Sequence, residues 1–117
     1  MKKVKIKGSL KSEEQTYCFE SVGVYEDGIL KYQDNDVLVS IDVKNNFMIR
    51  STDSYEIVFN FQKNKKTSNM LKLKDLNQTI EMSLKTIDLL IKEGYYYVQY
   101  ELNDDELFVF ELNYIGG

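Results

Sequence analysis

The chain has 117 residues, of which 43% are hydrophobic and 29% charged, so we expect one globular domain over residues 1–117 and not a disordered chain. Its net charge of −4 disfavours nucleic-acid binding, which depends on neutralising phosphates. No apolar run approaches a membrane span, the charged N-terminus lacks the apolar stretch of a signal peptide, and the single Cys18 fits a reducing compartment, so we expect a cytoplasmic protein that does not bind membranes.

Short segments of strand-forming residues follow one another along the whole chain. No proline interrupts them, and nine Tyr and six Phe favour strands. A helix over 84–91 is the main alternative, but that segment is short and lacks a cap. The pattern predicts an all-β protein: a single antiparallel meander of about 8–10 strands, without a long helix, closed into a barrel. The predicted strands are 2–9, 15–25, 29–34, 37–43, 47–52, 55–62, 69–74, 78–91, 95–102 and 107–115.

In the middle of the chain, the large apolar residues share one parity of sequence position. Between Val37 and Phe61 they stand almost entirely at odd positions, as expected if alternate side chains enter one core. Opposed residues of an antiparallel pair share a face, so this parity predicts three-residue loops at 44–46 and 52–54, with Asn46 in the left-handed conformation. The same reasoning predicts a three-residue loop at 26–28, where Gly28 supplies a positive φ.

Elsewhere in the chain, the apolar pattern predicts bulges in two strands and a specific register for the last hairpin. The apolar parity changes between Leu84 and Ile87, which predicts a β-bulge near Lys85 or Thr86. A second change between Phe19 and Val22 predicts another bulge near residues 20–21. Lys3, Lys5 and Lys7 are expected on the solvent face of a protected edge strand. The last hairpin is expected to have an odd-length connection around 104–106, with Tyr96, Val98, Tyr100 and Leu102 opposite Tyr114, Leu112, Phe110 and Phe108.

The chain offers few groups for catalysis or metal binding. It contains no histidine, the commonest general base and metal ligand, and its one cysteine cannot form the usual zinc sites. The carboxylates of Asp34 and Asp36 only loosely resemble the start of a calcium loop, and 104–106 is expected to be a solvated turn. We therefore expect no metal site and no cofactor, and we rank catalysis below binding.

Two groups of residues are candidates for function. Arg50, the only arginine, is expected to point away from the odd-numbered face and to lie opposite Glu56. It forms either a cross-strand ion pair, the interpretation we favour, or an anion-binding group. Tyr95 and Tyr97 are expected to share an outer face with Leu107 and Val109, as an apolar patch for an interface or beneath another segment.

The order of several short motifs resembles the YwiB-like family of small bacterial proteins. Its expected fold is a calycin-type, lipocalin-like barrel, and it supplies no catalytic residues. The segment 32–37 is shorter than is usual for that family, and Thr52 stands where a glycine is expected. The motifs that carry the resemblance are Ser21-Val22-Gly23-Val24-Tyr25, Leu30-Lys31-Tyr32-Gln33-Asp34, Phe47-Met48-Ile49-Arg50-Ser51, Ile80-Glu81-Met82-Ser83-Leu84-Lys85-Thr86 and Tyr114-Ile115-Gly116-Gly117.

The first functional hypothesis is non-catalytic binding of a small apolar ligand inside the barrel or at its mouth. Its candidate residues are Arg50, Glu56, Tyr55 and Tyr96. Because many rings occupy the inward parity, we expect little room in the centre and a site near a rim. The alternative is a structural or interaction module that uses the outer tyrosine face and forms a homodimer.

Overall fold

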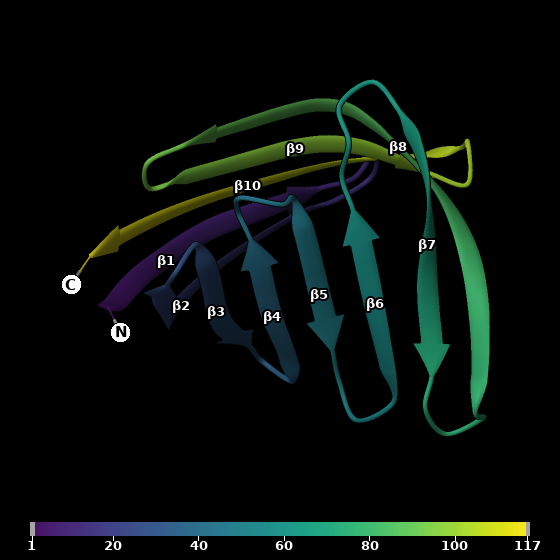
Figure 1. The fold of residues 1–117 in the computed structure, drawn as a ribbon, viewed down its shortest axis with the longest axis horizontal. Helices are drawn as coiled ribbons and strands as arrows, with labels where there is room; N and C mark the ends of the chain where they lie inside the picture. The colour runs from purple at the N-terminus through teal and green to yellow at the C-terminus, as the bar shows by residue number, and fades with distance from the viewer. Residues whose placement is uncertain (1, 117) are drawn as a thin grey trace.

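A computed structural model describes residues 2–116 of the chain. These residues form ten antiparallel strands and no helix, and each strand pairs with its neighbours in the sequence. The first strand also pairs with the last, which closes the sheet into a barrel (Figure 1). The strands are β1 (Lys2–Lys11), β2 (Thr16–Glu26), β3 (Ile29–Asp34), β4 (Val37–Asp42), β5 (Phe47–Ser51), β6 (Tyr55–Asn60), β7 (Lys66–Leu73), β8 (Gln78–Lys92), β9 (Tyr95–Leu102) and β10 (Glu106–Gly116).

The all-β meander and its closure are therefore confirmed. Figure 1 shows β3–β7 side by side as one wall, while β1, β9 and β10 cross above it at a steep angle. The long strand β8 belongs to both parts: it runs beside β7 and then bends to pair with β9. The bend coincides with a shift in the β8–β9 register between Thr86 and Asp88, so the bulge predicted near Lys85 or Thr86 is confirmed.

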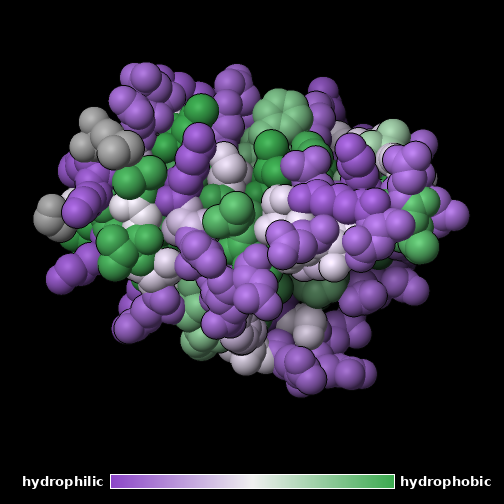
Figure 2. Space-filling view, turned by 90° about the horizontal axis from the view of Figure 1, so that it is seen from below, coloured by the Kyte–Doolittle hydropathy of each residue, from purple (hydrophilic) through white to green (hydrophobic). Residues whose placement is uncertain are grey.

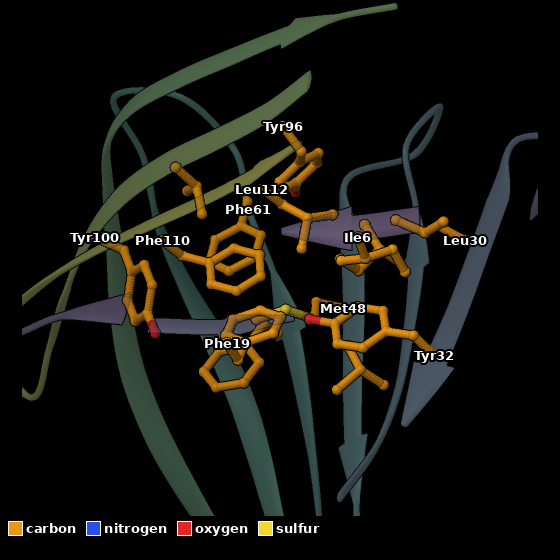
Figure 3. Close-up of a cluster of buried hydrophobic side chains, with 14 of the residues drawn as sticks. Ile6, Phe19, Leu30, Tyr32, Met48, Phe61, Tyr96, Tyr100, Phe110 and Leu112 are labelled. Carbon is orange, nitrogen blue, oxygen red and sulfur yellow. The ribbon is translucent and has the colours of Figure 1, made fainter. Parts of the chain in front are cut away.

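The core fills the region where the two parts of the barrel cross. It consists of aromatic and aliphatic residues from most of the strands, and Figure 3 shows their side chains converging from opposite walls. Stacked rings such as Phe19 on Tyr32 and Phe59 on Phe61 occupy much of it. The core residues are Val4, Ile6, Phe19, Leu30, Tyr32, Val39, Ile41, Met48, Phe59, Phe61, Leu84, Tyr96, Val98, Tyr100, Phe110 and Leu112.

The odd parity holds in β4 and β6 but fails in β5. Asp42 pairs with Phe47, so the first connection has four residues, 43–46, and the predicted three-residue loop is wrong. The second connection does comprise residues 52–54, but Ser51 pairs with Glu56 and not with Tyr55, so its predicted register is wrong. Asn46 does take the left-handed conformation, with a φ of 60°. A side chain stabilises the longer loop: Asp42 Oδ1 accepts the backbone N–H groups of residues 44 and 45. The β4–β5 and β5–β6 registers each differ from the predicted register by one residue, in opposite directions. Only β5 therefore presents the opposite face to the core.

The predicted loop at 26–28 is also wrong. Glu26 pairs with Ile29, which leaves a two-residue turn with φ values of 52° at Asp27 and 81° at Gly28. Positive φ at both positions is the type I′ geometry that matches strand twist. Tyr25 then faces inward opposite Leu30, and Val24 faces outward opposite Lys31.

The bulge predicted near residues 20–21 is absent. The register of β1 with β2 runs without interruption, so β2 presents odd positions to the interior throughout. Val22 and Val24 lie on the outside, and Val22 is 68% exposed. The prediction failed because an apolar residue on the outer surface has the same effect on the pattern as a shift of the strand.

The last hairpin and the first strand are partly as predicted. The β9–β10 connection has an odd length, residues 103–105, and the predicted residues share the inner face, but the register differs by two: Tyr96 lies opposite Leu112. Lys3, Lys5 and Lys7 are exposed, as expected. However, β1 pairs on both sides and is not an edge strand.

Candidate functional site

The reversal of β5 places the only arginine inside the barrel. Arg50 lies opposite Val39 on one side and Ile57 on the other, and Val39 is buried in the core. Because opposed residues share a face, Arg50 points inward. Its predicted outward orientation and its predicted position opposite Glu56 are both wrong. The row continues through Leu71 to Ile80, so Arg50 on β5 stands at the end of an apolar stripe that crosses β6, β7 and β8.

This stripe is not sealed from solvent. Ile57, Leu71 and Arg50 are half-buried, and Ile80 is 44% exposed, although all four belong to the inward-facing row. Two residues deeper in β5 and β6, at the next inward-facing positions, Met48 and Phe59 are buried. The inner surface of β5–β8 is therefore open near the loops at 52–54 and 74–77 and closed at depth. Seen from that side, patches of apolar surface lie among polar side chains (Figure 2).

Arg50 has no partner of its own. No hydrogen bond or ion pair joins it to any other residue within 2–116. Three tyrosines nonetheless lie within electrostatic reach of Arg50. Its charge partly opposes the rise in pKa that the hydrogen bond to Asp34 causes in Tyr17 and that burial causes in Tyr32 and Tyr100. The site thus combines a half-buried cation with phenol groups.

Burial raises the pKa of two of these hydroxyls. Desolvation raises the pKa of Tyr32, and Arg50 only partly opposes the rise. Desolvation likewise raises the pKa of Tyr100 to about 12. The Tyr32 ring points into the interior beside Phe19 and Met48 (Figure 3), is 5% exposed, and its hydroxyl oxygen is buried without a hydrogen-bond partner. An orphaned hydroxyl of this kind costs free energy, and a bound acceptor would remove that cost.

Polar residues form the rim near Arg50. The Tyr17 hydroxyl donates to Asp34 Oδ1 at 2.9 Å, and the side-chain amide of Asn35 donates to the Tyr17 oxygen at 3.2 Å. The hydrogen bond to Asp34 is the main cause that raises the pKa of Tyr17, with burial and the Asp34 charge adding to it. This cluster connects β2 to the β3–β4 turn and leaves Asp34 hydrogen-bonded to Tyr17.

The other predicted ligand-binding residues do not gather around Arg50. Glu56 lies opposite Ser51 and Lys72 on the outer parity. Tyr55, opposite Leu73, is half-buried on the inward parity nearer the rim. Tyr96 is fully buried, and its hydroxyl also lacks a partner, but it lies across the cluster from Tyr32 (Figure 3), and burial alone raises its pKa.

Sequence reasoning missed the three tyrosines whose hydroxyls the charge of Arg50 influences. One signal was available for Tyr32 and Asp34, because both share a parity with Leu30 in a short strand. Tyr100 was expected in the core, but nothing in the sequence relates it to Arg50, which lies 50 residues away. Barrel closure brings these residues together.

The predicted outer tyrosine face exists in part. Tyr95 and Tyr97 lie opposite Asn113 and Glu111, and the Tyr95 hydroxyl donates to Glu111 Oε2 at 2.6 Å. That hydrogen bond is the main cause that raises the pKa of Tyr95 to about 12. Leu107 and Val109 lie further along β10, opposite Glu101 and Gln99. All four predicted residues are half-buried, and self-association through them stays a prediction.

A more exposed apolar surface lies elsewhere on the outside. Val22 and Leu38, which is 58% exposed, line a cavity of about 470 Å³ together with Ile49 and other residues of β1–β5. It is separated from the inward-facing stripe by the sheet itself, because these residues point outward.

Within 2–116, no three Asp, Glu or Cys side chains are grouped so as to hold a metal ion. Over the same range, the chain has no helix of the length and apolarity that crossing a bilayer requires.

A solved structure with a similar fold is the ywiB protein from Bacillus subtilis. The two superpose with a TM-score of 0.63 over 98% of this chain and 90% of that chain, at 13% sequence identity. At this identity the likeness concerns the fold alone, and it supports the YwiB-like barrel expected from the motifs. No protein-family model matches the sequence, and no curated protein matches it. The resemblance to the wider calycin class stays a prediction.

Proposed function

We propose that this protein binds a small molecule with a largely apolar body at the open end of its barrel, without catalysing a reaction on it. The observation that carries the proposal is the inward-facing stripe of Ile57, Leu71 and Ile80, which remains accessible to solvent. Apolar surface inside a concave wall is the usual basis for holding a small ligand.

Binding is preferred to catalysis because of the residues present. The chain contains no histidine. Asp34, at the rim, is already hydrogen-bonded to Tyr17, and burial raises the pKa of Tyr32 and Tyr100 further above the ordinary value of 10.0. These groups are suited to orienting a ligand and poorly suited to accepting a proton near neutral pH. An exposed, unpaired Cys18 accords with a reducing, cytoplasmic location, which we include in the proposal.

A neutral fluorescent probe, N-phenyl-1-naphthylamine, tests this proposal with two neighbouring substitutions on β7. Leu71 faces the open end, whereas Met70 is exposed on the outer face. We expect the wild-type protein to enhance the probe's emission. Leu71→Glu should weaken binding by about tenfold or more, because it places a carboxylate against the apolar stripe. Met70→Glu should leave binding within about twofold, as expected for a substitution away from the site.

Leu38→Glu is the control for the outer cavity, since Leu38 lines that cavity and faces away from the barrel interior. A wild-type protein that fails to bind the probe contradicts the proposal. So does a loss of binding in Leu38→Glu with normal binding in Leu71→Glu, because the probe would then occupy the outer surface. Far-UV circular dichroism establishes that each variant retains its strands.

A further inference from the structure

We propose that the ligand is a monocarboxylate, whose carboxylate is held by Arg50 and the Tyr32 hydroxyl while its apolar tail lies along Ile57, Leu71 and Ile80. This inference rests on the proposed function and names the chemical class of the ligand. Two features of the structure support it: Arg50 is a half-buried cation without a counter-ion, and the buried Tyr32 hydroxyl lacks a hydrogen-bond acceptor.

Arg50 lacks a partner for its positive charge. A guanidinium that is partly withdrawn from water loses hydration, and within residues 2–116 no carboxylate or hydrogen-bond acceptor compensates it. Its planar fork matches the two oxygens of a carboxylate, which can accept two parallel N–H donors. An anionic ligand would therefore supply the missing partner at the place where the apolar stripe ends.

Tyr32 supplies the second donor. Its hydroxyl is buried and points into the interior, and burial raises its pKa further above the ordinary value of 10.0, so it carries its proton near neutral pH. A protonated phenol can donate a hydrogen bond to a carboxylate oxygen. Tyr32 and Arg50 stand on strands separated only by β4, and the charge of Arg50 reaches the Tyr32 hydroxyl.

The charge of the rim selects a ligand of low charge. Asp34 shares the inward parity of Tyr32 and lies near Tyr17, which also senses the charge of Arg50. One cation with one carboxylate nearby favours an anion of a single charge, because a doubly charged phosphate would meet repulsion that one guanidinium does not offset. The site therefore favours a carboxylate over a phosphate ester.

The length of the stripe sets the size of the tail. From Arg50 to Ile80 the row crosses three strand spacings of about 4.8 Å each, or roughly 14 Å. This distance suits a medium-length aliphatic chain lying across the strands. Buried Met48 and Phe59 close the floor beneath the stripe, so a long tail would not fit within the interior.

Competition against the neutral probe provides the test, with decanoate and 1-decanol as matched competitors. Their tails are alike and only decanoate carries a charge. We expect the wild-type protein to bind decanoate about tenfold more tightly than 1-decanol, as for a charge-assisted contact. Arg50→Met should abolish that preference and leave binding of the probe intact. Tyr32→Phe should weaken decanoate binding about threefold or more, with little change for 1-decanol.

Lys72→Met is the matched control, because it removes an exposed positive charge from the outer parity of β7. It should preserve the preference for decanoate. Equal binding of decanoate and 1-decanol by the wild-type protein, or a preference that survives in Arg50→Met, would overturn the inference. If the wild-type protein binds the probe in that case, the proposed function stands alone. If it binds neither the probe nor decanoate, the proposed function and the inference both fail.

Discussion

The individual residues that define this protein are its buried tyrosines. Tyr32 and Tyr96 have buried hydroxyls without partners, and Tyr100 is almost fully buried. A phenol is tolerated in such a place because its ring contributes much apolar area, but its ionised form is not. These residues should therefore couple the stability of the fold to alkaline pH, and Arg50 should lessen the effect only for those within its reach.

At the residue scale, we predict that stability falls as pH rises from about 10 to about 12, partly through Tyr100. Burial raises the pKa of Tyr100 to about 12 in the folded state, against an ordinary value of 10.0. The unfolded state loses the proton first, so the contribution is fully present below pH 10 and is lost as pH rises through 12. The expected loss from this residue is about 3 kcal/mol.

Urea unfolding at a series of alkaline pH values measures this dependence. Tyr100→Phe should show a shallower fall of the free energy of unfolding than the wild-type protein. Tyr97→Phe, on the outer face, controls for the removal of a tyrosine. An equal fall in Tyr100→Phe and the wild-type protein would show that Tyr100 does not contribute.

At the scale of elements, the junction of β6 and β7 depends on a buried amide. Their ladder runs from Tyr55 opposite Leu73 to Val58 opposite Met70. Beyond it, Asn69 Oδ1 accepts the backbone N–H of Asn60 at 2.6 Å, and the Asn69 amide donates to Thr67. The Thr67 hydroxyl donates to the Asn60 carbonyl at 2.7 Å, so side chains continue the pairing where the backbones part.

We expect Asn69→Leu to lower the free energy of unfolding by about 2–3 kcal/mol, because it leaves the partly buried N–H of Asn60 without its acceptor and removes the hydrogen bonds to Thr67. Neighbouring Ser68 is exposed and points outward, so Ser68→Ala should change stability by less than about 0.5 kcal/mol. Thermal or urea unfolding of the two variants makes the comparison. Similar stabilities would mean that water satisfies the Asn60 N–H and that Asn69 does not hold the two strands together.

At the scale of the whole molecule, β1 is the strand that closes the barrel. It pairs with β2 along its length and with β10 from the other end of the chain. Without this closure, β2 and β10 would present unpaired edges, and the walls that enclose the core would separate. Buried Val4 and Ile6 fasten β1 to the interior, while lysines occupy its outer face.

We therefore expect Ile6→Ala to cost about 2–5 kcal/mol, the usual range for emptying a buried aliphatic site. Lys5→Ala, one position away on the outer face, should cost less than about 0.5 kcal/mol. If closure is cooperative, tyrosine fluorescence and far-UV circular dichroism should report one coincident transition in both variants. Separate transitions would indicate that the β1–β10 seam opens before the rest of the barrel unfolds.

The sequence by itself determined the class of fold and much of its detail. Alternation of apolar residues predicts the strands and the meander, and the break in parity near Thr86 predicts the bulge, because these features depend on neighbours along the chain. Asn46 and Gly28 mark left-handed positions for the same local reason. For the candidate site, the sequence pointed only to Arg50, because it is the only arginine in the chain.

Only the tertiary structure decided which face of β5 enters the barrel. Two registers are compatible with the residues at 43–46 and 52–55, and a change of one residue reverses every side chain of the strand. Met48 and Ile49 are both apolar, so the pattern within β5 does not choose between them. Packing of Met48 into the closed core makes this choice and turns Arg50 inward. There its charge influences the hydroxyls of Tyr32 and Tyr100, residues that closure brings from distant parts of the chain.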